Sequence, residues 1–214
     1  MKVAEESTAP TLIHNDLEMT SSVLRDLISD KVEKIVVDSK ENFKKVQKII
    51  KEDSLEISDS IEHYKKRAPL FKQEKIDDEI VKLLRNKVWL KSGAYLIVEK
   101  TEAMVVVDVN SGKFVGKKKH EDNSLKINLE AAKEIAKQLR LRHLSGLILI
   151  DFIDMTSAEN RKKIYLEMKK ELKKDRAKVA VSEISEFGVL EMTRERTGLS
   201  IVDNLTEPCD SCRG

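Results

Sequence analysis

Residues 104–112 read MVVVDVNSG, and residues 147–154 read LILIDFID. Each is an apolar run that meets an aspartate, Asp108 in the first and Asp151 in the second. Such runs are typical of strands buried in the middle of a sheet. Apolar residues at helical spacing over 124–142 separate the two runs and predict a long helix between them. The order strand, helix, strand indicates an α/β fold.

Further strands and helices are predicted on both sides of this unit. Strands over 88–90 and 95–99, followed closely by the run at 104–108, predict an antiparallel meander. Residues 112–123, rich in glycine and lysine, are expected to form a loop. Thr156, Ser157, Ala158 and Glu159 form a capping-box pattern that predicts a helix to about residue 174. The last strands are expected at 179–182 and 189–193.

The first third of the chain alternates short strands and helices. A change of character near residue 87 predicts a boundary between a smaller N-terminal unit and a larger C-terminal one. Within the smaller unit, Ser39 is expected to cap a helix. The elements expected there are strands at 11–14, 34–38 and 60–65 and helices at 18–30, 40–51 and 74–86.

The composition excludes several classes of protein. Charged residues make up 36% of the 214 residues, but 40 Lys and Arg against 38 Asp and Glu leave a net charge of only +2. Strong non-specific nucleic-acid binding therefore cannot be inferred from net charge. Aromatic residues, at 4%, argue against base stacking as the main binding device. The absence of an 18-residue apolar run and of a secretory signal predicts a cytoplasmic protein without a membrane span.

The two aspartates suggest a metal site. Ligands of open α/β sheets bind outside the carboxyl ends of the strands. If the two strands are neighbours, Asp108 and Asp151 meet, and a divalent cation such as Mg²⁺ relieves their repulsion. Such a site suits phosphodiester chemistry. The alternative is that both are ordinary turn or cap residues. Asn110 points to the same side as Asp108 if the strand continues, and is otherwise a turn residue.

Two basic segments are candidates for contact with a polyanion. Lys113–Lys119 follows Asp108 closely, and residues 175–178 read DRAK. Basic side chains beside an acidic metal pair would hold phosphates. The alternative for both segments is a solvated surface loop.

The cysteines Cys209 and Cys212 have the spacing of a zinc knuckle. Structural zinc takes four ligands, so one chain supplies half a site. A second chain would complete the site across a two-fold axis. The alternatives are a free dithiol or a frayed tail.

Several long motifs resemble the RNase E/RNase G family of bacterial endoribonucleases. They are VWLKSGAYLIVEKTEAMVVVDVNSGKFVG, NLEAAKEIAKQLRLRHLSGLILIDFIDM, DRAKVAVSEISEFGVLEMTRERTGLS and the terminal CDSCRG. The resemblance covers about residues 87–214 and extends back to about residue 11. It implies a disordered tail at 1–10, a structural RNase H-like subdomain at 11–86, a DNase I-like catalytic subdomain at 87–205 and a zinc-link at 206–214.

The resemblance also implies roles for individual residues. Asp108 and Asp151 would ligate catalytic Mg²⁺, and Asn110 would position the water or the scissile phosphate. Lys178 would contact RNA, and we add Lys113 and Lys117 as RNA-binding candidates. The implied reaction is hydrolysis of single-stranded, AU-rich RNA in RNA processing and decay, leaving 5′-phosphate and 3′-hydroxyl ends.

The zinc-link of the family implies a homodimer that shares one structural Zn²⁺ between Cys209 and Cys212 of both chains, and a tetramer in the full-length enzyme. The family also has an N-terminal OB-fold RNA-binding domain and a 5′-monophosphate sensor, neither of which matches this chain. We therefore expect a catalytic-core fragment. One alternative is a truncated, catalytically weak module for zinc-linked dimerisation or RNA binding. A second is an Mg²⁺-dependent phosphatase or nucleotide hydrolase.

Overall fold

The computed structural model describes residues 24, 32–52, 60–112, 120–207, 209 and 211. The chain divides into two compact units, Met1–Ile76 and Asp77–Gly214. The predicted tail at 1–10 and the predicted strand at 11–14 lie outside the described residues. So does the predicted helix at 18–30, except for Leu24, which is helical and buried.

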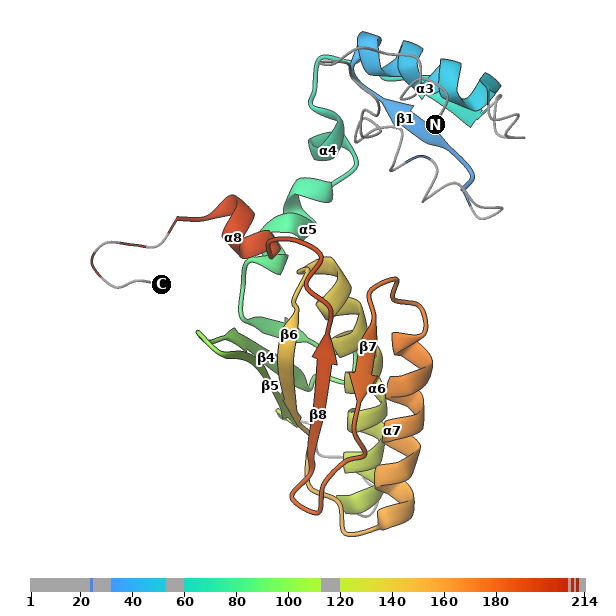
Figure 1. The fold of residues 1–214 in the computed structure, drawn as a ribbon. Coiled ribbons are helices and arrows are strands. Elements are labelled where there is room, and N and C mark those ends of the chain that lie inside the picture. The colour runs from blue at the N-terminus through green and yellow to red at the C-terminus, as the bar shows by residue number, and fades with distance from the viewer. Residues whose placement is uncertain are drawn as a thin grey trace, which may run out of the picture. The chain divides into compact units, whose positions relative to one another are not determined.

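The first unit contains a strand–helix–strand arrangement (Figure 1). Strand β1 (Ile35–Val37) pairs in parallel with β2 (Ile61–His63), and helix α3 (Lys40–Glu52) connects them. The Ser39 side chain accepts a hydrogen bond from the Asn42 backbone N–H, which confirms the predicted cap. The buried residues Leu24, Val46 and Ile50 form a small core. The short helix α4 (Leu70–Gln73) follows, and α5 (Ile76–Leu83) begins at the end of this unit.

The second unit is built on a six-stranded sheet with the order β3-β4-β5-β6-β8-β7. Strands β3, β4 and β5 form the predicted antiparallel meander. Strand β6 lies parallel to β5, as expected for two strands joined by a helical crossover. The bounds of the strands are β3 (Lys87–Trp89), β4 (Tyr95–Lys100), β5 (Met104–Asn110), β6 (Gly146–Asp151), β7 (Val179–Val181) and β8 (Val189–Arg194).

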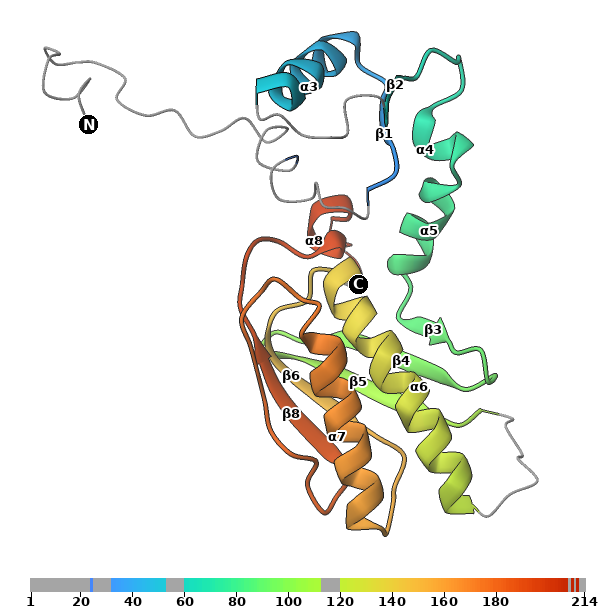
Figure 2. The ribbon, with the colours of Figure 1, turned by 90° about the vertical axis from the view of Figure 1, so that its right-hand side faces the viewer.

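Two helices lie side by side on one face of this sheet (Figure 2). They are α6 (His120–Leu141) and α7 (Ala158–Leu172). Alternate residues of the strands, such as Val107, Ile150 and Leu190, point toward these helices and are buried with Ile135 and Met168. Burial of this apolar face is the main source of stability of the unit. The predicted loop over 112–123 is corrected at its end, because helix α6 already begins at His120.

The opposite face of the sheet carries the other set of alternate residues. Among the described residues of the central strands, those on this face are exposed or half-buried. Leu147 keeps 39% of its surface and Trp89, on the edge strand, keeps 64%. We call this side of the sheet the open face.

The last helix among the described residues is one that the sequence patterns did not predict. Helix α8 (Ile201–Leu205) begins with a capping box in which the Ser200 and Asp203 side chains bond to each other's backbone N–H groups. Within the described part of the chain, no helix has the length and apolar content needed to cross a membrane.

Candidate active site

The two predicted aspartates meet on the open face. Strands β5 and β6 are adjacent and parallel, and their register places Asp108 directly opposite Asp151. Both residues are exposed. The next residues along each strand, Val109 and Phe152, are buried on the helix side. The period of two along each strand thus holds both carboxylates on the open face at its carboxyl edge.

Asn110 belongs to the same cluster. Strand β5 continues to Asn110, so this residue is not in a turn and faces the same side as Asp108. Its side-chain amide donates a hydrogen bond of 2.6 Å to Oδ2 of Asp108. The bond orients the Asp108 carboxylate and leaves Oδ1 of Asp108 without a bond to Asn110.

The electrostatics of the cluster are those of excess negative charge. Burial raises the pKa of Asp151, and the neighbouring carboxylates of Asp108 and Asp154 raise it further. A divalent cation between the carboxylates would reverse this repulsion. All the side chains that converge here offer oxygen, the donor that Mg²⁺ prefers. Among the described residues no group of three or more His, Cys, Asp or Glu could hold a metal. The two carboxylates therefore fit an ion that keeps several waters or a phosphate.

A buried asparagine holds the chain just after Asp151. Asn128 of helix α6 is fully buried. Its amide donates 2.8 Å to the Ile153 carbonyl, and its Oδ1 accepts 3.1 Å from the Ile153 N–H. Both polar groups of a loop residue are thus satisfied inside the protein. We did not single out Asn128 from the sequence. The available signal was a polar residue on the apolar face of a predicted helix.

The capping prediction near this loop needs a correction of one residue. Helix α7 is capped by Ser157, whose hydroxyl accepts from the Asn160 N–H, and not by Thr156. Glu121 of α6 accounts for the shift. It accepts hydrogen bonds from the Thr156 hydroxyl at 2.6 Å and from the Ser157 N–H at 2.9 Å, so that Thr156 faces another helix.

A glycine contact fixes the loop that follows Asn110. Gly112 has φ +61°, and a Cβ on it would lie 2.7 Å from the carbonyl oxygen of Gly93. Only glycine allows both this left-handed conformation and this close approach. The β3–β4 turn therefore lies directly against the end of the DVNSG motif.

The remaining predicted site residues either lie outside the described residues or are described at positions away from the pair. Lys113, Lys117 and Cys212 lie outside the described residues. Lys178 precedes β7, whose first residue pairs with Arg194 at the far end of β8 from the Asp151 partner Val189. Cys209 is exposed near the end of the chain.

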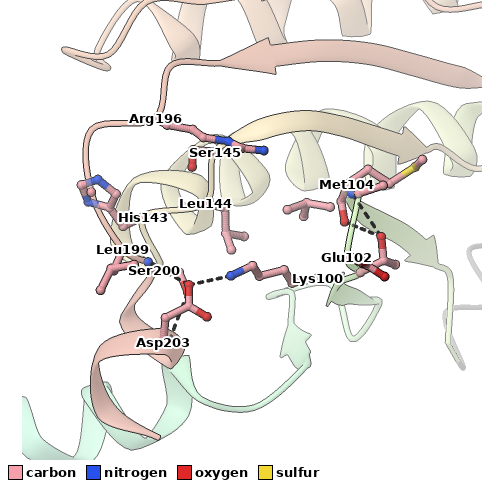
Figure 3. Close-up of a pocket in the computed structure, with 14 residues that line it drawn as sticks. Lys100, Glu102, Met104, His143, Leu144, Ser145, Arg196, Leu199, Ser200 and Asp203 are labelled. Atoms are coloured by element: carbon pink, nitrogen blue, oxygen red, sulfur yellow. Dashed lines mark hydrogen bonds and ion pairs between the residues drawn. The ribbon is translucent and has the colours of Figure 1, made fainter. Parts of the chain in front are cut away.

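A cavity of about 280 Å³ lies at the opposite end of the sheet (Figure 3). Lys100, Ser145, Arg196 and Asp203 are among its lining residues. The Lys100 ammonium and the Asp203 carboxylate point toward each other, with a nitrogen–oxygen distance of 2.5 Å. Lys100 and Asp203 thus pair with each other in the lining of this cavity, and neither Asp108 nor Asp151 lines the cavity. We place the candidate active site at the aspartate pair, whose carboxylates repel each other and form no ion pair with any described residue.

Comparison with known proteins shows the family of the chain. The model of the Ribonuclease E/G family matches residues 1–197, and the chain belongs to this family. It is 39% identical to Ribonuclease G of Escherichia coli strain K12 over 216 residues, covering 100% of this chain and 44% of the relative. It is 40% identical to Ribonuclease G of Haemophilus influenzae, covering 94% and 41% of the two chains.

A third relative is Ribonuclease E of Nostoc sp., which is 36% identical over 99% of this chain and 31% of its own length. The chain thus spans less than half of the length of each of these relatives.

Proposed function

We propose that this chain carries the catalytic centre of an endoribonuclease that hydrolyses single-stranded, AU-rich RNA in the cytoplasm. Membership of the Ribonuclease E/G family supports the reaction class. The observation that carries the assignment of the centre is the register pairing of Asp108 with Asp151 on the open face. An exposed site accepts a phosphodiester in the middle of a long chain, whereas a closed pocket would not.

In this proposal Asp108 and Asp151 hold catalytic Mg²⁺. The bound ion would polarise a phosphoryl oxygen and increase the acidity of water. Asn110 keeps the Asp108 carboxylate in place through its 2.6 Å hydrogen bond and positions the water or the scissile phosphate. The water gives up a proton, its oxygen bonds to phosphorus, and the bond from phosphorus to the 3′ oxygen breaks. The 3′ oxygen takes up a proton, which leaves 3′-hydroxyl and 5′-phosphate ends.

The proposal includes further contacts with RNA and with a second chain. Lys178 and the lysines of 113–119 would hold flanking phosphates. Cys209 and Cys212 would supply two of four thiolates to a structural Zn²⁺ shared with a second chain, as required for a tetrahedral site. The exposed position of Cys209 is compatible with such a bridge.

Cleavage of a short fluorescent AU-rich RNA by the purified chain, with and without Mg²⁺, tests the centre. We expect Mg²⁺-dependent cutting that Asp108→Asn and Asp151→Asn abolish. Glu191→Gln is the matched control, because Glu191 is an exposed carboxylate on the open face of β8 that faces Leu149 and not the pair. Undiminished cutting by either aspartate variant, or equal loss in Glu191→Gln, would refute the assignment.

A further inference from the structure

The only tryptophan of the chain is exposed beside the candidate active site. Trp89 ends strand β3, at the edge of the sheet, and keeps 64% of its surface. An indole is among the most costly side chains to leave in water. Single exposed apolar residues are common, so exposure alone assigns no role to Trp89. Its neighbours distinguish it from an ordinary surface residue.

Trp89 is part of a small aromatic platform with a cation on it. It pairs in register with Tyr95 of β4, and the two ring centroids are 5.3 Å apart at an interplanar angle of 61°. The Lys87 ammonium lies 4.2 Å from the Trp89 centroid and 3.7 Å from the Tyr95 centroid. Aromatic faces with an adjacent positive charge are what a nucleotide meets in single-strand binding grooves, where bases stack and cations hold the phosphates.

The platform is continuous with the aspartate pair. Tyr95 is the register partner of Asn110, which donates its hydrogen bond to Asp108. A Cβ built on Gly112 would lie 3.6 Å from Cδ1 of Tyr95, so the ring also borders the end of the DVNSG motif. Neighbouring strands are about 5 Å apart, so Trp89 lies about 10 Å across the sheet from Asn110. A nucleotide adjacent to one held at the pair therefore reaches Trp89.

We propose that the platform formed by Lys87, Trp89 and Tyr95 binds a nucleotide of single-stranded RNA next to the scissile phosphate. The base stacks on Trp89 and the Lys87 ammonium contacts a phosphate. This inference rests on the proposed function, which supplies the RNA. Stacking tolerates any base, so the platform would strengthen binding and set the register of cutting more than it selects a sequence. Few aromatic residues suffice, because the fold brings two of them to the site.

The unique tryptophan allows a direct test by fluorescence. The Asp108→Asn chain is titrated with a short single-stranded RNA while Trp89 emission is followed. A stacked base is expected to quench the emission with saturation. A matched titration with double-stranded RNA, whose bases are already stacked, is expected to give little quenching.

Variants then separate stacking from a structural role. Stacking of one base is worth enough that Trp89→Ala is expected to bind the RNA about tenfold more weakly by anisotropy. Trp89→Phe keeps a ring and should retain most of the affinity. Tyr165→Ala is the matched control, because Tyr165 on helix α7 also has a lysine, Lys169, 5.5 Å from its ring centroid but lies on the helix side of the sheet.

The outcomes are distinguishable from those of the proposed function. Absence of quenching, or a Trp89→Ala chain that binds as tightly as Tyr165→Ala, overturns the platform even if Asp108→Asn abolishes cutting. Emission that shifts with protein concentration in the absence of RNA also overturns it, because a second copy of the chain then covers Trp89. If Asp108→Asn still cuts while Trp89 is quenched, the platform stands as an RNA site and the catalytic assignment fails.

Discussion

Asp108 and Asp151 are direct register partners on parallel strands, so the fold holds two carboxylates side by side on the open face. Burial, and then the charges of Asp108 and Asp154, raise the pKa of Asp151. Without a cation, this pairing therefore lowers the stability of the folded chain at neutral pH. The repulsion persists in the folded state because the strand pairing and the buried side chains on the opposite face fix the positions of both carboxylates.

The pH dependence of stability follows from this pairing. A carboxyl group whose pKa is higher in the folded state binds more protons when folded. Unfolding free energy then falls as pH rises from about 4, the unfolded value, through the raised pKa. The Asp151→Asn variant lacks this fall. At pH 7 its free energy of unfolding should therefore be higher than that of the wild type by up to about 0.5 kcal/mol, the range for exposed substitutions. Urea unfolding across this pH range in EDTA measures the difference. The prediction is contradicted if the free energy of unfolding of the wild type increases relative to that of the variant as pH rises.

Added Mg²⁺ should reverse the order of stability. An ion bound only by the folded chain stabilises it by about 1.4 kcal/mol at ten times its dissociation constant. The midpoint temperature of thermal unfolding should therefore rise with Mg²⁺ concentration in the wild type and in Glu191→Gln. The response should be lost in Asp108→Asn and in Asp151→Asn. An equal Mg²⁺ response in all four proteins would mean that the ion binds elsewhere.

Asn128 positions the chain after Asp151 and should matter both for stability and for the ion. Asn128→Ala leaves the Ile153 N–H and carbonyl without their partner, at a cost of about 2–4 kcal/mol for two part-buried groups. Because Ile153 lies two residues after Asp151, the variant should also need more Mg²⁺ for half-maximal cutting. A purely structural role predicts lower stability with an unchanged Mg²⁺ midpoint at a temperature where the variant is folded. Asn160→Ala, which changes a half-buried asparagine in the first turn of α7, is the control.

The strands and the long helices could be predicted from the sequence because each has a characteristic local spacing of apolar residues. The runs at 104–108 and 147–152 became β5 and β6, and the helical spacing over 124–142 became α6. That Asp108 lies opposite Asp151 could be stated only as a condition. Register between strands separated by a helix is set by packing of both faces, not by either strand alone.

The supporting residues of the site escaped prediction for the same reason. Asn128 bonds to a residue 25 positions away, and Trp89 reaches the site only through the pairing of three strands. The low aromatic content suggested that stacking was unimportant, yet two aromatic residues gather beside the pair. Composition counts residues and carries no information on where the fold brings them together.

A buried ion pair between Arg194 and Asp175 lies at the other end of the sheet, and its removal should strongly destabilise the fold. Arg194 donates to both carboxylate oxygens of Asp175, at 2.8 and 3.1 Å, and to the Leu144 carbonyl. Despite the opposing effect of burial, the hydrogen bond from Arg194 keeps the pKa of Asp175 low. Asp175→Ala leaves a buried guanidinium without its anion and should cost about 3–5 kcal/mol.

The pH dependence provides the check on this pair. A carboxyl with a lowered folded-state pKa stabilises the protein above its unfolded pKa, and this stability is lost as pH falls through the lowered value. The difference between wild type and Asp175→Ala in urea unfolding should therefore be full at pH 7 and shrink below about pH 4. Glu159→Ala, which breaks the exposed pair with Lys163, should cost less than about 1 kcal/mol. Equal losses in the two variants would show that burial does not strengthen the Asp175 pair.

Substitution of two glycines near the active site distinguishes the cost of backbone strain from the cost of a steric contact. Gly112 and Gly93 both have positive φ, +61° and +87°, but a Cβ on Gly93 would meet nothing within 4 Å. Gly93→Ala should therefore cost only the left-handed conformation, about 1 kcal/mol. Gly112→Ala adds a 2.7 Å approach to the Gly93 carbonyl, a backbone atom that cannot turn away, so it should cost about 1–3 kcal/mol more.

Relief of this contact moves the strand end that holds Asn110, so Gly112→Ala should also slow RNA cutting while Gly93→Ala does not. Urea unfolding and single-turnover cutting of both variants test this, and similar stability and rates in the two would show that the contact does not hold the DVNSG loop.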